Sequence, residues 1–196
     1  MDVVAILMAA GRGRRFDPAG ARNKLLQALP SGDPVVVASA RKLLATLPRV
    51  VAVVPPQDGG VAALLAGLGC EVTVCAAADS GMAASLVHAV RHSLSGTGPA
   101  PGAWLVALGD MPHVAPATLA ALRDALAAGA PIVAPVHAGR RGNPVGFGRA
   151  HLDALLALEG DQGARRLLQT CPVTEVAVED PGIFLDIDTP ADLSPV

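Results

Sequence analysis

The chain has 196 residues, of which 52% are hydrophobic and only 2% aromatic, and its formal net charge is −2. This length fits one domain, residues 1–196, with a sizeable core that Ala, Val and Leu must largely fill. The slightly acidic balance excludes a general nucleic-acid binder, and the shortage of aromatic rings excludes a base-stacking surface for single strands.

Cysteine usage and the start of the chain indicate where the protein works. Cys70, Cys75 and Cys171 show no zinc-ligand spacing, and such a sparse set favours a reducing compartment. Arginines follow the apolar first segment, whereas a signal peptide places its positive charges before the apolar run. No apolar stretch approaches the roughly 18 residues that a membrane span needs. We therefore expect a cytoplasmic protein that contacts neither membrane nor nucleic acid.

Apolar runs that suit buried parallel strands alternate with helical stretches rich in Ala and Leu. In chain order we expect a strand at 3–8, a helix at 35–46, a strand at 50–54, a helix at 61–68, a strand at 71–75, a helix at 82–95, a strand at 104–108, a helix at 116–128 and a strand at 132–136. The less regular last third predicts strands at 143–147, 173–178 and 184–187 and helices at 150–158 and 163–170. The alternation predicts an α/β fold, a three-layer α/β/α sandwich around a Rossmann-like, mostly parallel sheet.

A loop rich in Gly and Arg follows the first expected strand directly. Residues 7–16 read LMAAGRGRRF, and two glycines in this loop allow backbone N–H groups to approach phosphate oxygens closely. Five cations stand within residues 12–24: Arg12, Arg14, Arg15, Arg22 and Lys24. In a chain that is acidic overall, this concentration of positive charge points to a polyanionic ligand such as a triphosphate.

Two common nucleotide loops are excluded by their defining residues. A Walker A loop needs Gly-Lys-Ser/Thr, which is missing here, and a dinucleotide fingerprint needs a third glycine where Phe16 stands. An arginine-rich turn exposed to solvent remains the alternative interpretation of the loop taken alone.

Carboxylates follow two later strands. Asp110, in the sequence LGDMP, comes directly after the strand expected at 104–108. It suits Mg²⁺, which usually takes only one or two protein carboxylates together with substrate phosphates. The alternative is that Asp110 only turns the chain. Asp186 and Asp188 alternate with Ile187, so both acids face one side of the strand expected there, and one of them is a candidate second metal ligand.

Together these motifs resemble a known family. Residues 7–16, followed by Lys24, resemble the LAAGxGxRxG…K signature of nucleotidyltransferases that act on NTPs. Residues 109–112 look like the metal-binding site of that family, and residues 81–86 are similar to its base-contacting loop. Residues 141–147, 160–165 and 186–190 resemble later motifs of the molybdenum cofactor cytidylyltransferases, relatives of the molybdopterin guanylyltransferases.

The resemblance implies a fold and a reaction. The fold would be that of the nucleotide-diphospho-sugar transferases. The terminal phosphate of the molybdenum cofactor would attack the α-phosphate of CTP in line, and pyrophosphate would leave. The resemblance implies Mg²⁺ as cofactor, CTP and the molybdenum cofactor as substrates, and transient contact with proteins that mature molybdoenzymes.

The resemblance also assigns roles to residues. Catalytic roles fall to Arg15, Lys24 and Asp110, and metal binding falls to Asp110 with Asp186 as preferred second ligand and Asp188 next. Nucleotide binding is implied for Ala9, Ala10, Gly11, Arg12, Gly13, Arg14, Gly81 and Ser85, and acceptor binding for Arg141, Gly142, Asn143, Pro144 and Asp161.

Two details of the first motif affect this assignment. Ala10 matches the LAAG of the cytidylyl branch, whereas the guanylyl branch has LAGG, so Ala10 favours CTP. The gap between Phe16 and Lys24 is longer than the family pattern, and Arg22 could share the role of Lys24. The alternatives are a guanylyltransferase of the same cofactor, a transferase for another small phosphorylated acceptor, and a non-catalytic nucleotide sensor.

Overall fold

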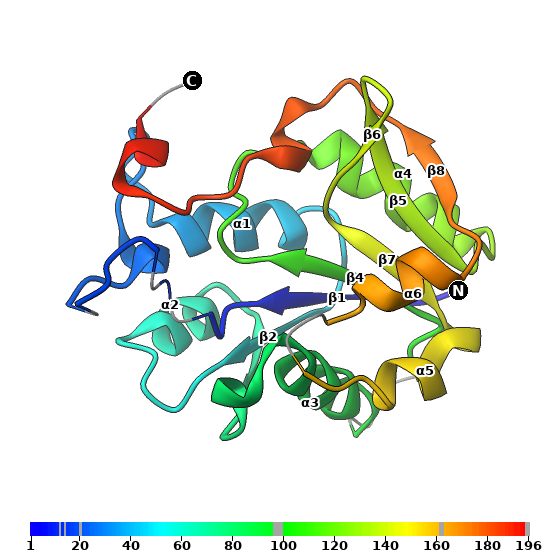
Figure 1. Cartoon of the computed structure of the whole chain (residues 1–196), viewed down its shortest axis with the longest axis horizontal. Helices are drawn as coiled ribbons and strands as arrows, with labels where there is room; N and C mark the ends of the chain where they lie inside the picture. Colours follow the sequence, from blue (N-terminus) through cyan, green and yellow to red (C-terminus); the bar gives the residue numbers. More distant parts are fainter. Residues whose placement is uncertain (12, 14, 20, 96–99, 161–162, 195–196) are drawn as a thin grey trace.

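The computed structural model describes residues 1–11, 13, 15–19, 21–95, 100–160 and 163–194. A central sheet with helices on both faces dominates this part of the chain (Figure 1). Its strands are β1 (Val3–Met8), β2 (Val50–Val54), β3 (Glu71–Val74), β4 (Ala103–Leu108), β5 (Ile132–His137), β6 (Arg140–Arg141), β7 (Val145–Gly148) and β8 (Thr174–Ala177).

The sheet has the strand order β3-β2-β1-β4-β7-β5-β6, and β8 pairs with β5. Strands β3, β2, β1 and β4 are mutually parallel, whereas β7 runs antiparallel to both β4 and β5. The order reverses at β1, whose neighbours are β2 on one side and β4 on the other. Open α/β sheets bind ligands beyond the carboxyl ends of the strands at such a point. The loops after β1 and β4 therefore lie where a ligand is expected.

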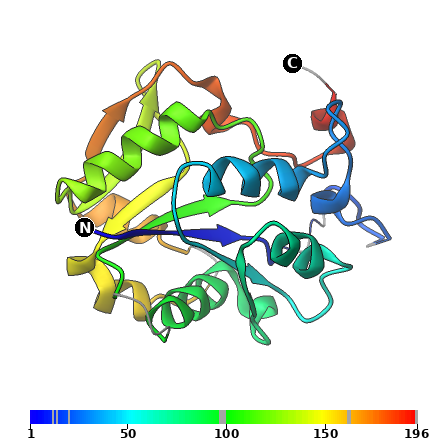
Figure 2. The same cartoon turned by 180° about the vertical axis from the view of Figure 1, so that it is seen from behind.

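Helices cover both faces of the sheet and create two separate cores. One face packs against α1 (Val35–Leu44), α2 (Val61–Gly67) and α4 (Pro116–Ala127), and the other against α3 (Met82–Leu94), α5 (Leu152–Leu156) and α6 (Arg165–Thr170). Seen from behind, α1 and α4 lie together on one side of the sheet and α3 on the other (Figure 2). The fold predicted from sequence, helices on both faces of a mostly parallel sheet, is confirmed.

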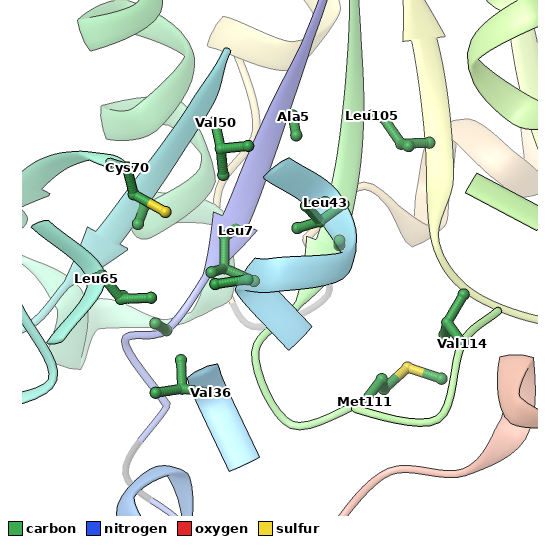
Figure 3. Close-up of a cluster of buried hydrophobic side chains, with 14 of the residues drawn as sticks. Ala5, Leu7, Val36, Leu43, Val50, Leu65, Cys70, Leu105, Met111 and Val114 are labelled. Carbon is green, nitrogen blue, oxygen red and sulfur yellow. The ribbon is translucent and has the colours of Figure 1, made fainter. Parts of the chain in front are cut away.

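Small and branched aliphatic side chains fill the first core, as the composition predicts. Leu7 of β1 packs with Val36 and Leu43 of α1 and Leu65 of α2 (Figure 3). The second core holds the largest side chain, Trp104, whose indole N–H donates a hydrogen bond to Ser93 Oγ at 2.9 Å. No helix among the described residues is long and apolar enough to cross a membrane.

The elements expected in the first two thirds are confirmed with ends that differ by at most two residues. In the last third, the strand expected at 184–187 is wrong. A 3-10 turn (Pro181–Phe184) ends at the first of these residues instead, with Pro181 in its first turn and the Asp180 side chain accepting from Gly182 N–H. The residues that follow this turn do not join the sheet. The Ile187 N–H instead donates to the carbonyl of Asp110, a loop residue, at 2.8 Å. The hairpin strand β6 was not expected.

Candidate active site

The loops that follow β1 and β4 leave the sheet side by side. Met8 and Leu108 are partners in the register of the two strands, and Gly109 N–H donates to the Met8 carbonyl at 2.9 Å. A Cβ at position 109 would lie only 3.1 Å from that carbonyl oxygen, so a glycine lets the two loops approach. This contact joins the loop that carries the arginines to the loop that carries Asp110.

The loop after β1 turns tightly at Gly13, whose φ of +58° favours glycine. The amides of Phe16 and Asp17 both donate to the Gly13 carbonyl, at 2.9 and 3.1 Å, and Phe16 is buried. A Cβ at position 13 would lie 3.3 Å from Lys24 Cγ, so the turn also packs against the predicted lysine. The predicted residues Arg12 and Arg14 lie outside the described residues.

Lys24 reaches the acidic residues despite the long gap that precedes it. Its ammonium lies 2.5 Å from Asp110 Oδ2 and 3.1 Å from Asp188 Oδ1, and its side chain is only 9% exposed. Burial lowers the pKa of Lys24, but the charges and hydrogen bonds of Asp110 and Asp188 outweigh burial and raise the pKa above its ordinary value. Lys24 is therefore a fixed positive charge. Arg22, the alternative to Lys24, instead lies 3.9 Å from Asp17.

The segment after the 3-10 turn brings two more carboxylates to the same place. Ile187 is buried, while Asp186 and Asp188 line a cavity beside Asp110, so the alternation predicted for a strand holds without one. Arg15 Nη1 lies 2.5 Å from Asp188 Oδ2, and the Arg15 side chain is 80% exposed. Burial, and then the negative charges of Asp188 and Asp110, raise the pKa of Asp186 above its ordinary value.

One oxygen in this cluster has no partner. Asp110 Oδ1 is buried and accepts no hydrogen bond from the described residues, although Oδ2 is held by Lys24. A buried, unpaired carboxylate oxygen is costly unless a ligand satisfies it. Among the described residues, however, no three carboxylate, histidine or cysteine side chains form a complete protein cage for a metal. The arrangement fits a cation such as Mg²⁺, for which one or two carboxylates and a substrate phosphate suffice.

The carboxylates and Arg15 open onto a cavity of about 630 Å³, here named the charged cavity. It is lined by Met8, Ala10, Gly11, Arg15, Leu25, Ala78, Asp79, Gly81, Met82, Ser85, Leu108, Asp110, Asp186 and Asp188. The predicted nucleotide residues Ala10, Gly11, Gly81 and Ser85 are thus brought together. Ala9 is buried in the core, and its N–H donates to the Val53 carbonyl at 3.0 Å.

A second cavity, of about 740 Å³, adjoins the first and is here named the rim cavity. Met8, Met82 and Leu108 line both cavities. Its floor is apolar, with Leu86, Val106, Val145, Ala164 and Leu168, and its polar lining is Arg141, Asn143, Arg165 and Gln169 with the backbone of Gly142.

Three of the predicted acceptor residues meet in this rim cavity, and two do not. Arg141, Gly142 and Asn143 line it, whereas Pro144 lines a small separate void between β4, α1 and α4. Asp161 lies outside the described residues. Arg141 is half-exposed and pairs with Glu175 at 2.7 Å.

Sequence reasoning missed three residues that support the loop of Asp110 without lining the charged cavity. Ser39 Oγ donates to the Gly109 carbonyl at 3.0 Å, and Lys42 Nζ donates to the Pro112 carbonyl at 2.5 Å, so α1 supports the loop that carries Asp110. Asp180 holds the other side of that loop through Ala115 N–H, at 2.8 Å. Ser39 and Lys42 lie within the expected helix, and no motif marks them.

Solved structures with the same fold cover almost the whole chain. Rv0371c from Mycobacterium tuberculosis H37Rv is 29% identical with a TM-score of 0.82, over 98% of this chain and 96% of that chain, and it has also been solved in complex with manganese. A nucleotidyl transferase from Methanothermobacter thermautotrophicus (Mth528) is 25% identical with a TM-score of 0.78, over 97% and 94% of the two chains.

A more distant likeness supports the fold alone. The molybdopterin-guanine dinucleotide biosynthesis protein A from Archaeoglobus fulgidus is 24% identical with a TM-score of 0.69, over 97% of this chain and 94% of that chain. A comparison with curated proteins gives no match. The model of the MobA-like NTP transferase domain matches residues 5–176. The chain therefore belongs to the family of MobA-like NTP transferase domains.

Proposed function

We propose that the chain transfers CMP from CTP to the terminal phosphate of the molybdenum cofactor and releases pyrophosphate. The observation that carries this proposal is the charged cavity, where Arg15 meets Asp110, Asp186 and Asp188 beside an unpartnered oxygen of Asp110. Lys24 pairs with two of these carboxylates, Asp110 and Asp188, from outside the cavity lining. Fixed charges of both signs in one partly enclosed site suit phosphoryl transfer, which needs positioning and charge neutralisation rather than a strong base.

Cations of the chain hold the triphosphate in this proposal. Arg15 is exposed and held only by Asp188 among the described ion pairs, so its guanidinium can turn to the β- and γ-phosphates. Lys24 is fixed by its carboxylate partners, and its ammonium has a third N–H to donate to a phosphate oxygen. Both charges stabilise the pyrophosphate as it leaves.

Asp110 and Asp186 would hold Mg²⁺. Oδ1 of Asp110 has no partner among the described residues. Burial, and then the negative charges of Asp188 and Asp110, raise the pKa of Asp186, and a bound cation would offset both effects. Asp188 is already engaged by Arg15 and Lys24. The manganese complex of Rv0371c supports a divalent metal in the family fold. When bound, Mg²⁺ would supply positive charge that neutralises part of the negative charge of the triphosphate.

The two adjoining cavities would hold the two substrates on opposite sides of the reacting phosphate. The base would occupy the part of the charged cavity formed by Ala10, Gly81 and Ser85, and the acceptor would occupy the rim cavity beside Arg141 and Asn143. An oxygen of the acceptor phosphate then forms a bond to the α-phosphorus from the side opposite pyrophosphate, and the bond from that phosphorus to pyrophosphate breaks.

Pyrophosphate release tests the proposal directly. The purified chain is incubated with Mg²⁺, molybdenum cofactor and either CTP or GTP. We expect release with CTP that requires both the metal and the cofactor. Absence of release with either nucleotide would contradict the enzyme function, and faster release with GTP would make the chain a guanylyltransferase. Equal release with a different phosphorylated acceptor would overturn the choice of molybdenum cofactor.

The nucleotide choice has its own variant. Ala10 is nearly buried and lines the charged cavity, so Ala10→Gly would enlarge the space beside the base by one methyl group. We expect the preference for CTP over GTP, measured as the ratio of kcat/KM values, to fall by about 10-fold. This is the low end of the discrimination that one methyl group provides in a binding pocket. An unchanged ratio would remove Ala10 from base recognition.

A further inference from the structure

Asp180 is a buried carboxylate at the start of the segment that ends in the two cavity carboxylates. It is 6% exposed and accepts three hydrogen bonds. Oδ2 accepts from Ala115 N–H at 2.8 Å and from Thr118 Oγ1 at 2.7 Å, and Oδ1 accepts from Gly182 N–H at 2.9 Å. One side chain thus joins residues 180–182 to the first turn of α4.

The segment 180–188 passes between two loops of the site and contacts both closely. A Cβ at Gly182 would collide with the His113 carbonyl, on the loop that follows β4. Further along, the Ile183 carbonyl accepts from Asn143 N–H at 3.0 Å, and Ile187 N–H donates to the Asp110 carbonyl at 2.8 Å. The segment therefore connects the loop of Asp110 with the loop of the rim cavity, and Asp180 is its anchor.

Few other bonds hold the start of the segment among the described residues. Pro181 has no N–H to donate. Apart from the bond between Asn143 N–H and the Ile183 carbonyl, the backbone bonds there, Ile183 N–H to Asp180 and Leu185 N–H to Gly182, lie within the turn itself. The bonds from Asp180 to Ala115 and Thr118 are the described side-chain bonds that join this turn to α4.

We propose that Asp180 is a positioning residue, which sets the place of Asp186 and Asp188 relative to Asp110. This inference rests on the proposed function, because it assumes that these carboxylates bind the metal and pair with the triphosphate cations. Without its anchor the segment can shift against the Asp110 loop. Misplacement of reacting groups by about 1 Å can cost on the order of 10²-fold in rate, and loss of a supporting contact typically costs about 10–100-fold in metal affinity.

Three variants remove the anchor in steps. Thr118→Val keeps the shape of the side chain but removes one donor to Asp180. Asp180→Asn keeps one side-chain oxygen and replaces the other by an amide N–H₂ group. This group must face a backbone N–H, that of Ala115 or that of Gly182, so one of the two bonds is lost. Asp180→Ala removes all three bonds. The matched control is Leu65→Ala in α2, which is fully buried, far along the chain from the segment, and lowers stability by creating a cavity.

The experiment measures the binding of Mn²⁺ to the full chain. The electron paramagnetic resonance signal reports the concentration of free Mn²⁺, and thermal unfolding of each variant is measured in parallel. We expect the Mn²⁺ dissociation constant to rise by about 10-fold or more in Asp180→Asn and Asp180→Ala, and by less in Thr118→Val. Leu65→Ala should unfold at a lower temperature and bind Mn²⁺ as the wild type does.

The outcomes separate this inference from the proposed function. If the wild type binds no Mn²⁺ and releases no pyrophosphate, the proposed function fails. If the wild type binds Mn²⁺ and the Asp180 and Thr118 variants lose stability without a change in the dissociation constant, Asp180 is only structural and the inference is overturned. Should Asp180→Ala not fold, Thr118→Val and Asp180→Asn decide the question by the same criterion.

Discussion

The two adjoining cavities are lined by different kinds of residues from different parts of the sheet. The charged cavity holds Arg15 and Asp110, on the loops at the carboxyl ends of β1 and β4, together with Asp186 and Asp188 on the segment after residue 184. The rim cavity has a mostly apolar floor, and its polar groups come from the β6–β7 connection and from α6. In the proposed function, phosphate chemistry would therefore lie at the parallel half of the sheet, and acceptor recognition at the antiparallel half. The two functions should therefore respond separately to substitution.

The largest expected effect is that of Asp110→Asn in the charged cavity. The change removes one of the two carboxylate charges that hold Lys24 and leaves a weaker ligand where Oδ1 stands unpaired. We expect turnover to fall by about 10²–10³-fold, the usual cost of losing one electrostatic group. Circular dichroism should show a folded chain, since Asn has the same shape. Turnover close to that of the wild type would place the metal site elsewhere. The charged cavity would then no longer be the place of the phosphate chemistry.

Arg15→Ala should have the next largest effect, confined to the nucleotide. Its guanidinium is 80% exposed and contributes little to stability, but a charged hydrogen bond to phosphate is worth about 1.5–3 kcal/mol. We expect KM for CTP to rise by about 10-fold or more, with KM for the acceptor unchanged. Arg22→Ala is the matched control, because Arg22 lies on the same loop and pairs with Asp17. Equal effects of the two variants would reduce Arg15 to a general positive charge.

Arg141→Ala tests the rim cavity. Arg141 pairs with Glu175, and both side chains are about half-exposed, so the loss of this pair should cost little stability. We expect KM for the acceptor to rise several-fold, as for one exposed charged contact, while KM for CTP stays the same. A parallel rise in both constants would show that the cavities act as one site.

The parallel half of the molecule could be predicted well, because a strand buried on both faces is a continuous apolar run in the sequence. Strands β1 and β4 are such runs, and the motifs follow them directly. Lys24 was predicted from its motif, but its contacts with Asp110 and Asp188 required the fold, since they join residues 86 and 164 positions apart.

The antiparallel half was predicted less fully. The strands expected at 132–136, 143–147 and 173–178 correspond to β5, β7 and β8, whereas β6 was not expected and residues 184–187 form no strand. The missed segments are short, and their hydrogen bonds depend on which neighbour is present. Residues 184–187 have a strand-like alternation, yet the amide of Ile187 bonds to a loop carbonyl rather than to a strand. Asp180 carries no sequence signal beyond an acid before proline, because its partners Ala115 and Thr118 lie more than sixty positions earlier.

The smallest expected effect concerns His113, which shares a loop with Asp110 but lines neither of the two cavities. Burial, and then the charge of Lys42, lower the pKa of His113 below its ordinary value of 6.5. Below pH 6.5 the unfolded chain therefore binds a proton that the folded chain resists, and stability falls as the pH drops through that value. In His113→Gln this part of the loss should vanish, and in Lys42→Met it should shrink. Urea unfolding midpoints at neutral and mildly acidic pH measure the difference. A variant that keeps the full wild-type loss would show that other groups cause it, and a change in turnover without a change in stability would show that this side of the loop acts on the charged cavity.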